Sequence, residues 1–178
     1  MRITISGPPG SGKTTVCDKL SKILGIKAVV FGRLFRELAL EKCISLAELG
    51  ILAEKDSSID ANIDAKIVEI AKSNDNIILE SRLAAHICDK NSISAFKIYI
   101  NASPKVRMLR ISTREKQSLK DVEENTIKRQ ASEVKRYKTY YNIDINDISV
   151  YDLVVDTDNL DSDGVVNVIL RAIGGNKC

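Results

Sequence analysis

Short apolar runs recur along the chain and indicate β-strands. They lie at residues 2–6, 28–31, 77–80, 97–100 and 153–156. Each run is apolar on nearly every residue and rich in β-branched side chains, which is typical of strands that are buried on both faces. We therefore expect five strands that have no solvent-exposed face.

Stretches with helical periodicity alternate with these runs. Three of them begin with capping signals: Ser45 with Glu48, Ser103 with Pro104, and Ser118 with Asp121. The last of these opens a helix that we expect to run to about Tyr140. Alternating strands and helices predict an α/β fold, a five-stranded parallel sheet with helices on both faces, which binds ligands at the carboxyl ends of its strands. Because no repeat or linker interrupts the pattern, we expect residues 1–178 to form one domain.

The stretch GPPGSGKT at residues 7–14 fits the P-loop pattern G-x-x-x-x-G-K-[ST]. A predicted strand precedes it and a helical run, residues 15–24, follows it. The backbone N–H groups of such a loop surround phosphates, its lysine reaches the β- and γ-phosphates, and its threonine hydroxyl binds Mg²⁺. The predicted ATP-binding residues are Gly7, Pro8, Pro9, Gly10, Ser11, Gly12, Lys13, Thr14 and Thr15.

A carboxylate ends the third apolar run. Residues 76–80 read NIILE, so that Glu80 lies at the tip of a predicted strand, and Arg82 follows two residues later. An acid at a strand tip beside a P-loop is well placed to hold Mg²⁺ through water. We therefore predict a metal site formed by Thr14 and Glu80.

Composition narrows the class of protein. The chain of 178 residues is 44% hydrophobic and 29% charged, as in soluble globular proteins, and no apolar run is long enough to cross a membrane. The sequence starts MRITIS and continues directly into the glycine loop, so we expect no signal peptide and a cytoplasmic location. Its four cysteines are far apart and form no CxxC pair, which argues against a zinc site or a disulfide framework.

Positive charge is concentrated in one segment. Residues 102–141 hold 11 Lys and Arg against 5 Asp and Glu. Arg110 and Arg114 are four residues apart, and Arg129 and Arg136 are seven apart, so each pair shares a helix face. Such a segment suits phosphate chemistry, RNA binding or a simple solvated face. We expect Lys116, Lys120, Lys128, Lys135 and Lys138 to belong to the solvated face.

Several segments together resemble the nucleoside monophosphate kinases, and most closely the archaeal-type cytidylate kinases. They are GPPGSGKTT at 7–15, FGRLFRE at 31–37, SIDANID at 58–64, LESRLAAH at 79–86, SEVKRYKTYYNIDI at 132–145 and SVYDLVVDT at 149–157. They cover nearly the whole chain. Ser81 is a departure, because that family usually has glycine between the acid and the arginine.

This resemblance implies an activity and roles for particular residues. The protein would be a monomeric, ATP- and Mg²⁺-dependent kinase that phosphorylates CMP and dCMP. Arg36 and Arg82 would grip the acceptor phosphate within an acceptor segment at about 32–72, where Asp60 would either lie near the base or ribose or face solvent. A mobile lid at about 110–129 would close over the transferred group, and the catalytic residues would be Lys13, Arg110, Arg114, Arg129 and Arg136. Two alternatives stay open: an adenylate kinase that uses AMP, and an RNA- or ribosome-associated ATPase.

Overall fold

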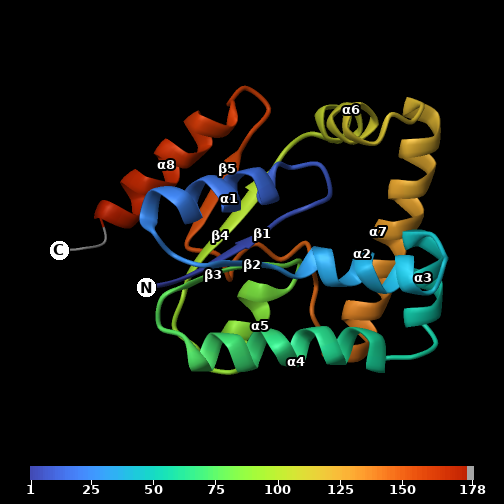
Figure 1. Ribbon diagram of the computed structural model, residues 1–178, viewed down its shortest axis with the longest axis horizontal. Coiled ribbons are helices and arrows are strands. Elements are labelled where there is room, and N and C mark those ends of the chain that lie inside the picture. Colours follow the sequence, from blue (N-terminus) through green and yellow to red (C-terminus); the bar gives the residue numbers. More distant parts are fainter. Residues whose placement is uncertain (176–178) are drawn as a thin grey trace.

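The computed structural model describes residues 1–175 and shows a five-stranded parallel sheet with helices on both faces (Figure 1). The strands are β1 Arg2–Ser6, β2 Ala28–Val30, β3 Ile77–Glu80, β4 Phe96–Asn101 and β5 Leu153–Asp156, in the order β2-β3-β1-β4-β5. The helices are α1 Lys13–Leu24, α2 Phe31–Glu41, α3 Leu46–Ala53, α4 Ser58–Ser73, α5 Ala84–Lys90, α6 Pro104–Glu115, α7 Leu119–Tyr141 and α8 Ser162–Gly175. The fold class predicted from the sequence is confirmed.

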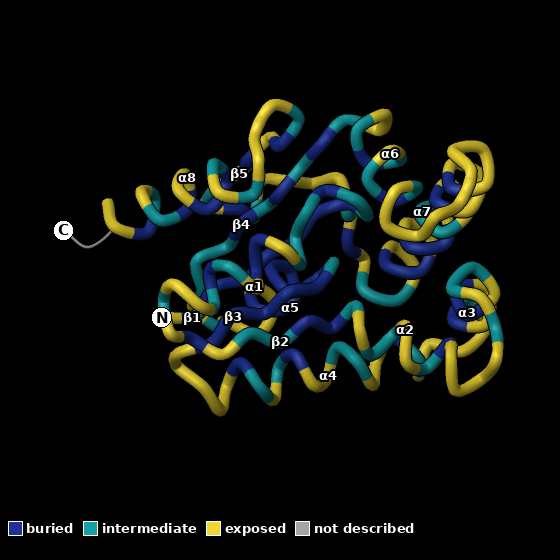
Figure 2. Tube along the Cα trace, turned by 45° about the horizontal axis from the view of Figure 1, so that its top comes forward, coloured by how far each residue is buried: buried dark blue, intermediate teal, exposed yellow. Residues whose placement is uncertain are grey.

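The sheet separates two hydrophobic cores, because successive residues of a strand point to opposite faces. Ile3, Ile5 and Ile98 pack with α1 and α8 on one face. Ile77 and Leu79 pack with α4, α5 and α7 on the other. Figure 1 shows α1 and α8 above the sheet and α4 and α5 below it, and Figure 2 shows β1 and β3 at the buried centre. Two covered faces explain why the central strands are mostly apolar. The expectation fails for β5, an edge strand that exposes Val154 and Asp156.

The element boundaries differ from the sequence prediction at two places that matter for the site. Phe31 was expected to end the second strand, but it begins α2, so a helix leaves the sheet directly after Val30. The helix after the glycine loop begins at Lys13 rather than Thr15, since Gly12 takes a left-handed conformation with φ 94° and serves as its N-cap. Lys13 therefore lies on the first turn of α1.

The three predicted capping signals all mark helix starts. Ser45 and Glu48 form a complete capping box at α3. Ser103 caps α6 and Ser118 caps α7, each accepting a hydrogen bond from a backbone N–H of its helix. α7 continues to Tyr141, which makes it the longest helix of residues 1–175 and lets it reach from α6 to α4 (Figure 1).

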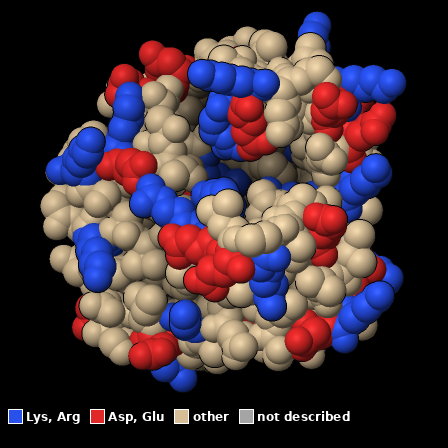
Figure 3. Space-filling model, turned by 45° about the vertical axis from the view of Figure 1, so that its right-hand side comes forward, with Lys and Arg blue, Asp and Glu red and all other residues tan. Residues whose placement is uncertain are grey.

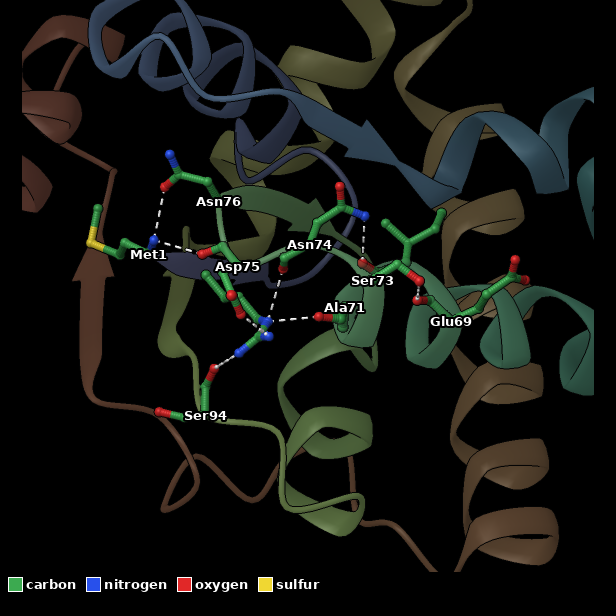
Figure 4. Close-up of polar contacts among 10 residues, drawn as sticks. Met1, Glu69, Ala71, Ser73, Asn74, Asp75, Asn76 and Ser94 are labelled. Atoms are coloured by element: carbon green, nitrogen blue, oxygen red, sulfur yellow. Dashed lines mark hydrogen bonds and ion pairs between the residues drawn. The ribbon is translucent and has the colours of Figure 1, made fainter.

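The amino-terminal end of the sheet is held by polar contacts far from the glycine loop (Figure 4). The Met1 amino group donates to the Asp75 carbonyl oxygen at 2.6 Å and to Asn76 Oδ1 at 2.8 Å. Arg2 Nε donates to the carbonyl oxygens of Ala71 and Asn74. These contacts fasten β1 to the loop before β3, and the two strands pair from Arg2 onward.

Three of the four cysteines lie within the described residues. Cys17 and Cys88 are buried and Cys43 is exposed, and all three are free thiols. Cys178 lies outside the described residues. Within residues 1–175, no helix combines the length and the apolar character that a membrane span requires.

Candidate active site

A cavity of about 460 Å³ opens at the carboxyl edge of the sheet. It is bounded by the glycine loop, α2, α4, the end of β3, α6, α7 and the segment after β5. Seven Lys and Arg line it, against five Asp and Glu. Figure 3 shows basic side chains around and inside a hollow on this side of the molecule. This excess of positive charge suits an anionic ligand.

The glycine loop packs so tightly that side chains are excluded from two of its positions. A Cβ at Gly7 would overlap the carbonyl oxygen of Ile100, and one at Gly10 would lie 2.6 Å from the carbonyl oxygen of Arg107. Both glycines also have positive φ, 145° and 81°. The residues from Pro9 to Thr15 line the main cavity, whereas Gly7 and Pro8 lie behind it and border a smaller one.

The side chain of Lys13 reaches back from the first turn of α1 to the glycine loop, where its Nζ donates a hydrogen bond of 2.9 Å to the carbonyl oxygen of Pro8. Burial lowers the pKa of Lys13 to about 7, with the nearby Arg82 lowering it further and Glu80 opposing the shift. Burial therefore disfavours the ammonium group, and a phosphate beside it would favour the charged form.

Thr14 and Glu80 come together as the sequence analysis expected of a metal site. Thr14 Oγ1 donates a hydrogen bond of 2.9 Å to Glu80 Oε2. Hydroxyl and carboxylate oxygens are ligands that Mg²⁺ accepts. In residues 1–175 no three His, Cys, Asp or Glu form a metal-binding group, so a metal here would need water and ligand phosphates to complete its shell. These two residues fit that kind of Mg²⁺ site.

The turn after β3 accommodates serine without strain. Ser81 does not have positive φ. Its backbone N–H donates to the Ile5 carbonyl oxygen, and its Oγ accepts from the Leu83 backbone N–H. This turn therefore does not need glycine, and Ser81 leaves Arg82 pointing at the back of the glycine loop, where its Nη1 donates to the Gly7 carbonyl oxygen.

A buried carboxylate that the sequence analysis did not single out connects two of the predicted arginines. Glu133 Oε2 lies 2.8 Å from Arg82 Nη2, and Glu133 Oε1 accepts a hydrogen bond of 3.0 Å from Arg129 Nε. The one signal in the sequence is the spacing of four residues between Arg129 and Glu133, which places both on one face of α7. That spacing is common on solvated helices, so alone it does not indicate a site.

Arg136 lies away from the predicted lid edge. Its side chain is 3% exposed, pairs with the buried Asp60 of α4, and stacks over the rings of Phe35 and Tyr137 at 5.6 and 5.4 Å. Seven residues of helix span about 10 Å, so Arg136 lies two turns further along α7 than Arg129, and its side chain is more deeply buried. Asp60 accordingly does not face solvent, which was one of its two expected environments.

The remaining predicted arginines lie around the cavity at different depths. Arg110 of α6 donates to Oγ1 and to the carbonyl oxygen of Thr157, just after β5. Arg114 is 62% exposed at the rim and pairs with Glu115. Arg36 of α2 lines the cavity, is exposed, and has no hydrogen bond or ion pair within residues 1–175. Partial desolvation lowers the pKa of Arg36, and Arg129 adds to this shift. An unpaired guanidinium in a cavity is suited to bind an anion.

The five lysines assigned to the solvated face are all exposed: Lys116, Lys120, Lys128, Lys135 and Lys138. None of them lines the main cavity. The cationic lining is therefore almost entirely arginine, with Lys13 as the exception.

Comparison with known proteins assigns the chain to a family. A model of the cytidylate kinase-like family matches residues 2–159. The chain belongs to this family. Proteins named cytidylate kinase from Methanothrix thermoacetophila and Methanosarcina barkeri are 46% and 45% identical over 97% of this chain and 98% and 96% of their own lengths. One from Sulfurisphaera tokodaii is 43% identical over 95% of this chain and 93% of its own length.

Solved structures agree on the fold at much lower identity. An uncharacterized protein from Eubacterium ventriosum superposes with a TM-score of 0.71 and 19% identity, over 98% of both chains. A shikimate kinase from Acinetobacter baumannii superposes with a TM-score of 0.64 and 17% identity, over 99% of this chain and 94% of its own. At such identities the likeness concerns the fold alone.

Asp64 of α4 provides a test of the electrostatics at the inner end of the cavity. Burial raises the pKa of Asp64 from 3.8 to about 6, and the nearby Tyr141 hydroxyl opposes the shift. The folded protein thus holds this proton more tightly than the unfolded chain. Tight binding of this proton stabilises the folded protein fully below pH 3.8, and the stabilisation is lost as the pH rises to about 6. Asp64→Asn should therefore raise the free energy of unfolding at neutral pH by about 1 to 3 kcal/mol.

Urea unfolding of both proteins at about pH 4 and about pH 7.5 measures this effect. The gain from Asp64→Asn should be present at the higher pH and small at the lower one. Glu124→Gln, which removes an exposed carboxylate from α7, is the control and should show no such difference. An equal effect of Asp64→Asn at both pH values would contradict the shift.

Proposed function

We propose that this protein transfers the γ-phosphoryl group of ATP directly to CMP, and also to dCMP, with Mg²⁺ bound. Membership of the cytidylate kinase-like family makes the chain a nucleoside monophosphate kinase as a class. The donor, the acceptor and the residue roles are the proposal. One observation carries it: a single cavity joins the glycine loop to a second group of cationic side chains, so that two phosphorylated ligands can meet.

The donor end of the cavity is the glycine loop. Its backbone N–H groups and Lys13 would bind the phosphates of ATP, and Thr14 and Glu80 would hold Mg²⁺, which supplies charge neutralisation between the phosphates when bound. Thr157, Leu160 and Val165 line the same cavity after β5. We assign the adenine to this segment because the segment lies on the same side of the cavity as the glycine loop and offers apolar surface.

The acceptor end is formed by the helices that leave the sheet at residues 32–72. Arg36 has no partner within the described chain and would grip the acceptor phosphate, with Arg82 as a second donor. Guanidinium groups suit this role because their N–H groups match two phosphate oxygens at once. The acceptor oxygen is already anionic near neutral pH, so transfer needs positioning and charge neutralisation rather than a general base.

The inner wall of the acceptor end has donors and acceptors that suit an amino-substituted base. Arg136 and Asp60 place a guanidinium next to a carboxylate, and Asp64 adds a second buried carboxyl oxygen without a hydrogen-bond partner. Cytosine presents an amino donor beside a ring-nitrogen acceptor, which this pair complements. Uracil presents the reverse pattern. Adenine shares the cytosine pattern on a larger ring system, which keeps AMP as the alternative acceptor.

Arg110, Arg114 and Arg129 are proposed to act from a lid at about 110–129. In the structure this range spans the end of α6 and the first half of α7, with three residues between the two helices. Closure over both substrates would bring these arginines to the γ-phosphoryl oxygens and exclude water that would otherwise hydrolyse ATP. The transfer would then occur in line, without a covalent intermediate.

A coupled assay of ADP release with CMP, dCMP, UMP and AMP tests the acceptor. We expect CMP to have the highest kcat/KM, dCMP to follow closely, and UMP to be weaker because its base presents the opposite donor and acceptor pattern. If AMP exceeds CMP by about tenfold or more, a difference of about 1.4 kcal/mol in transition-state stabilisation, the cytidylate assignment is wrong.

A further inference from the structure

We propose that Glu133 is a positioning residue that holds the guanidinium of Arg129 beside that of Arg82, in the orientation in which the terminal nitrogens of Arg129 receive phosphoryl oxygens. The proposal deepens the function proposed above and rests on it for its kinetic part. Glu133 lies on α7, is 4% exposed and lines the main cavity. Neither its residue type nor its spacing indicates such a role.

The first argument concerns the two oxygens of the Glu133 carboxylate. One accepts from Arg129 Nε and the other lies against Arg82 Nη2. Arg82 comes from the turn after β3 and Arg129 from α7, so a single carboxylate contacts two guanidiniums of different elements, Arg129 through a hydrogen bond and Arg82 through an ion pair. Because Arg82 Nη1 also donates to the Gly7 carbonyl oxygen, the arrangement extends to the back of the glycine loop.

The second argument concerns which nitrogen atoms remain for a ligand. Arg129 binds Glu133 through Nε, and its two terminal nitrogens make no hydrogen bond within residues 1–175. Those two nitrogens form the pair of parallel donors that suits a phosphate. Glu133 therefore binds Arg129 at Nε, which phosphate binding does not require, and leaves the two terminal nitrogens available to a ligand in the cavity.

The third argument is electrostatic. Arg82 and Arg129, with Lys13 and Arg136 nearby, are like charges in a small space and would turn away from one another without an anion between them. Burial tends to raise the pKa of Glu133, but attraction to Arg82, Arg129, Arg136 and Lys13 outweighs it, and the pKa of Glu133 is lowered. Glu133 is thus ionised at neutral pH, although it is buried. A fully ionised, buried carboxylate is able to hold both guanidiniums in place before substrates arrive.

A double-mutant cycle tests the proposal. Glu133→Gln keeps the size of the side chain but replaces one acceptor oxygen with an amide that repels a guanidinium. It should lower kcat by about tenfold to 10²-fold, the scale on which misplaced groups act, and change the KM values less. In the Arg129→Ala background the same substitution should cost at least about threefold less than in the wild type, because one of its two targets is gone. Asp89→Asn, an exposed acid outside the lid and the main cavity, is the charge-matched control and should retain wild-type kcat.

Nitrogen-15 NMR of the arginine Nε–H groups tests the proposal without an activity assay. In the wild-type protein without nucleotide, the Nε–H of Arg129 should exchange slowly with water, and Glu133→Gln should abolish that protection while circular dichroism stays unchanged. The same loss of kcat in both backgrounds, or an unprotected Arg129 Nε–H in the wild type, would overturn the proposal. If the wild type phosphorylates no nucleoside monophosphate, the proposed function fails, and the NMR result still decides whether Glu133 orients Arg129.

Discussion

Lys13→Ala should lower kcat by about 10³-fold or more, since it removes the cation placed at the β- and γ-phosphates of ATP. The pKa of Lys13 is lowered to about 7 by burial and by Arg82, so its charge is disfavoured relative to that of a lysine in water. Removing that charge relieves a cost in the folded protein, so the variant should unfold at a temperature no lower than the wild type. Steady-state kinetics and thermal unfolding measure the two effects separately.

Lys22→Ala is the matched control for Lys13→Ala, because Lys22 lies exposed in the last turn of the same helix. It should keep wild-type kcat and KM. Wild-type turnover by Lys13→Ala, together with an unchanged circular dichroism spectrum, would show that the glycine loop is not the donor site.

Arg129→Ala should lower kcat by about 10² to 10⁴-fold and barely change the affinity for either substrate, as expected for a group that acts mainly in the transition state. Lys128→Ala removes the same charge from the preceding residue, which is exposed and does not line the cavity. It should cost little. Comparing the two variants therefore separates the effect of where a side chain points from the effect of the net charge of the segment.

Equal losses in Arg129→Ala and Lys128→Ala would mean that residues 102–141 act as a diffuse basic surface. The lid mechanism would then have to be abandoned in favour of RNA binding, which a gel shift at two salt concentrations would reveal by its salt dependence.

The sequence predicted the parts of the fold that depend on local patterns. The apolar runs marked all five strands, since strands covered by helices keep most of their positions apolar. Ser45, Ser103 and Ser118 marked helix starts because each supplies an acceptor for a backbone N–H. The end of the second strand was placed one residue too far, since Phe31 suits a strand and a helix equally well in isolation.

The site was predictable where one short motif fixes the geometry, and less so where elements distant in the sequence meet. Thr14 and Glu80 were expected to lie together, because the carboxyl ends of parallel strands share one edge of the sheet. The pairing of Arg136 with Asp60 depends instead on how α7 packs against α4, which no pattern within α7 reveals. Glu133 was missed for the same reason, since only the packed structure shows that it is buried between Arg82 and Arg129.

The central claim, direct transfer from ATP to CMP, is tested most directly by following the phosphorus-31 NMR spectrum of the protein with ATP, Mg²⁺ and CMP. The account predicts that signals of CDP and ADP grow at equal rates, that no inorganic phosphate accumulates, and that omitting CMP stops ADP formation. Release of ADP with inorganic phosphate and without CDP, at the same rate whether or not CMP is present, would contradict the account and identify the protein as an ATPase.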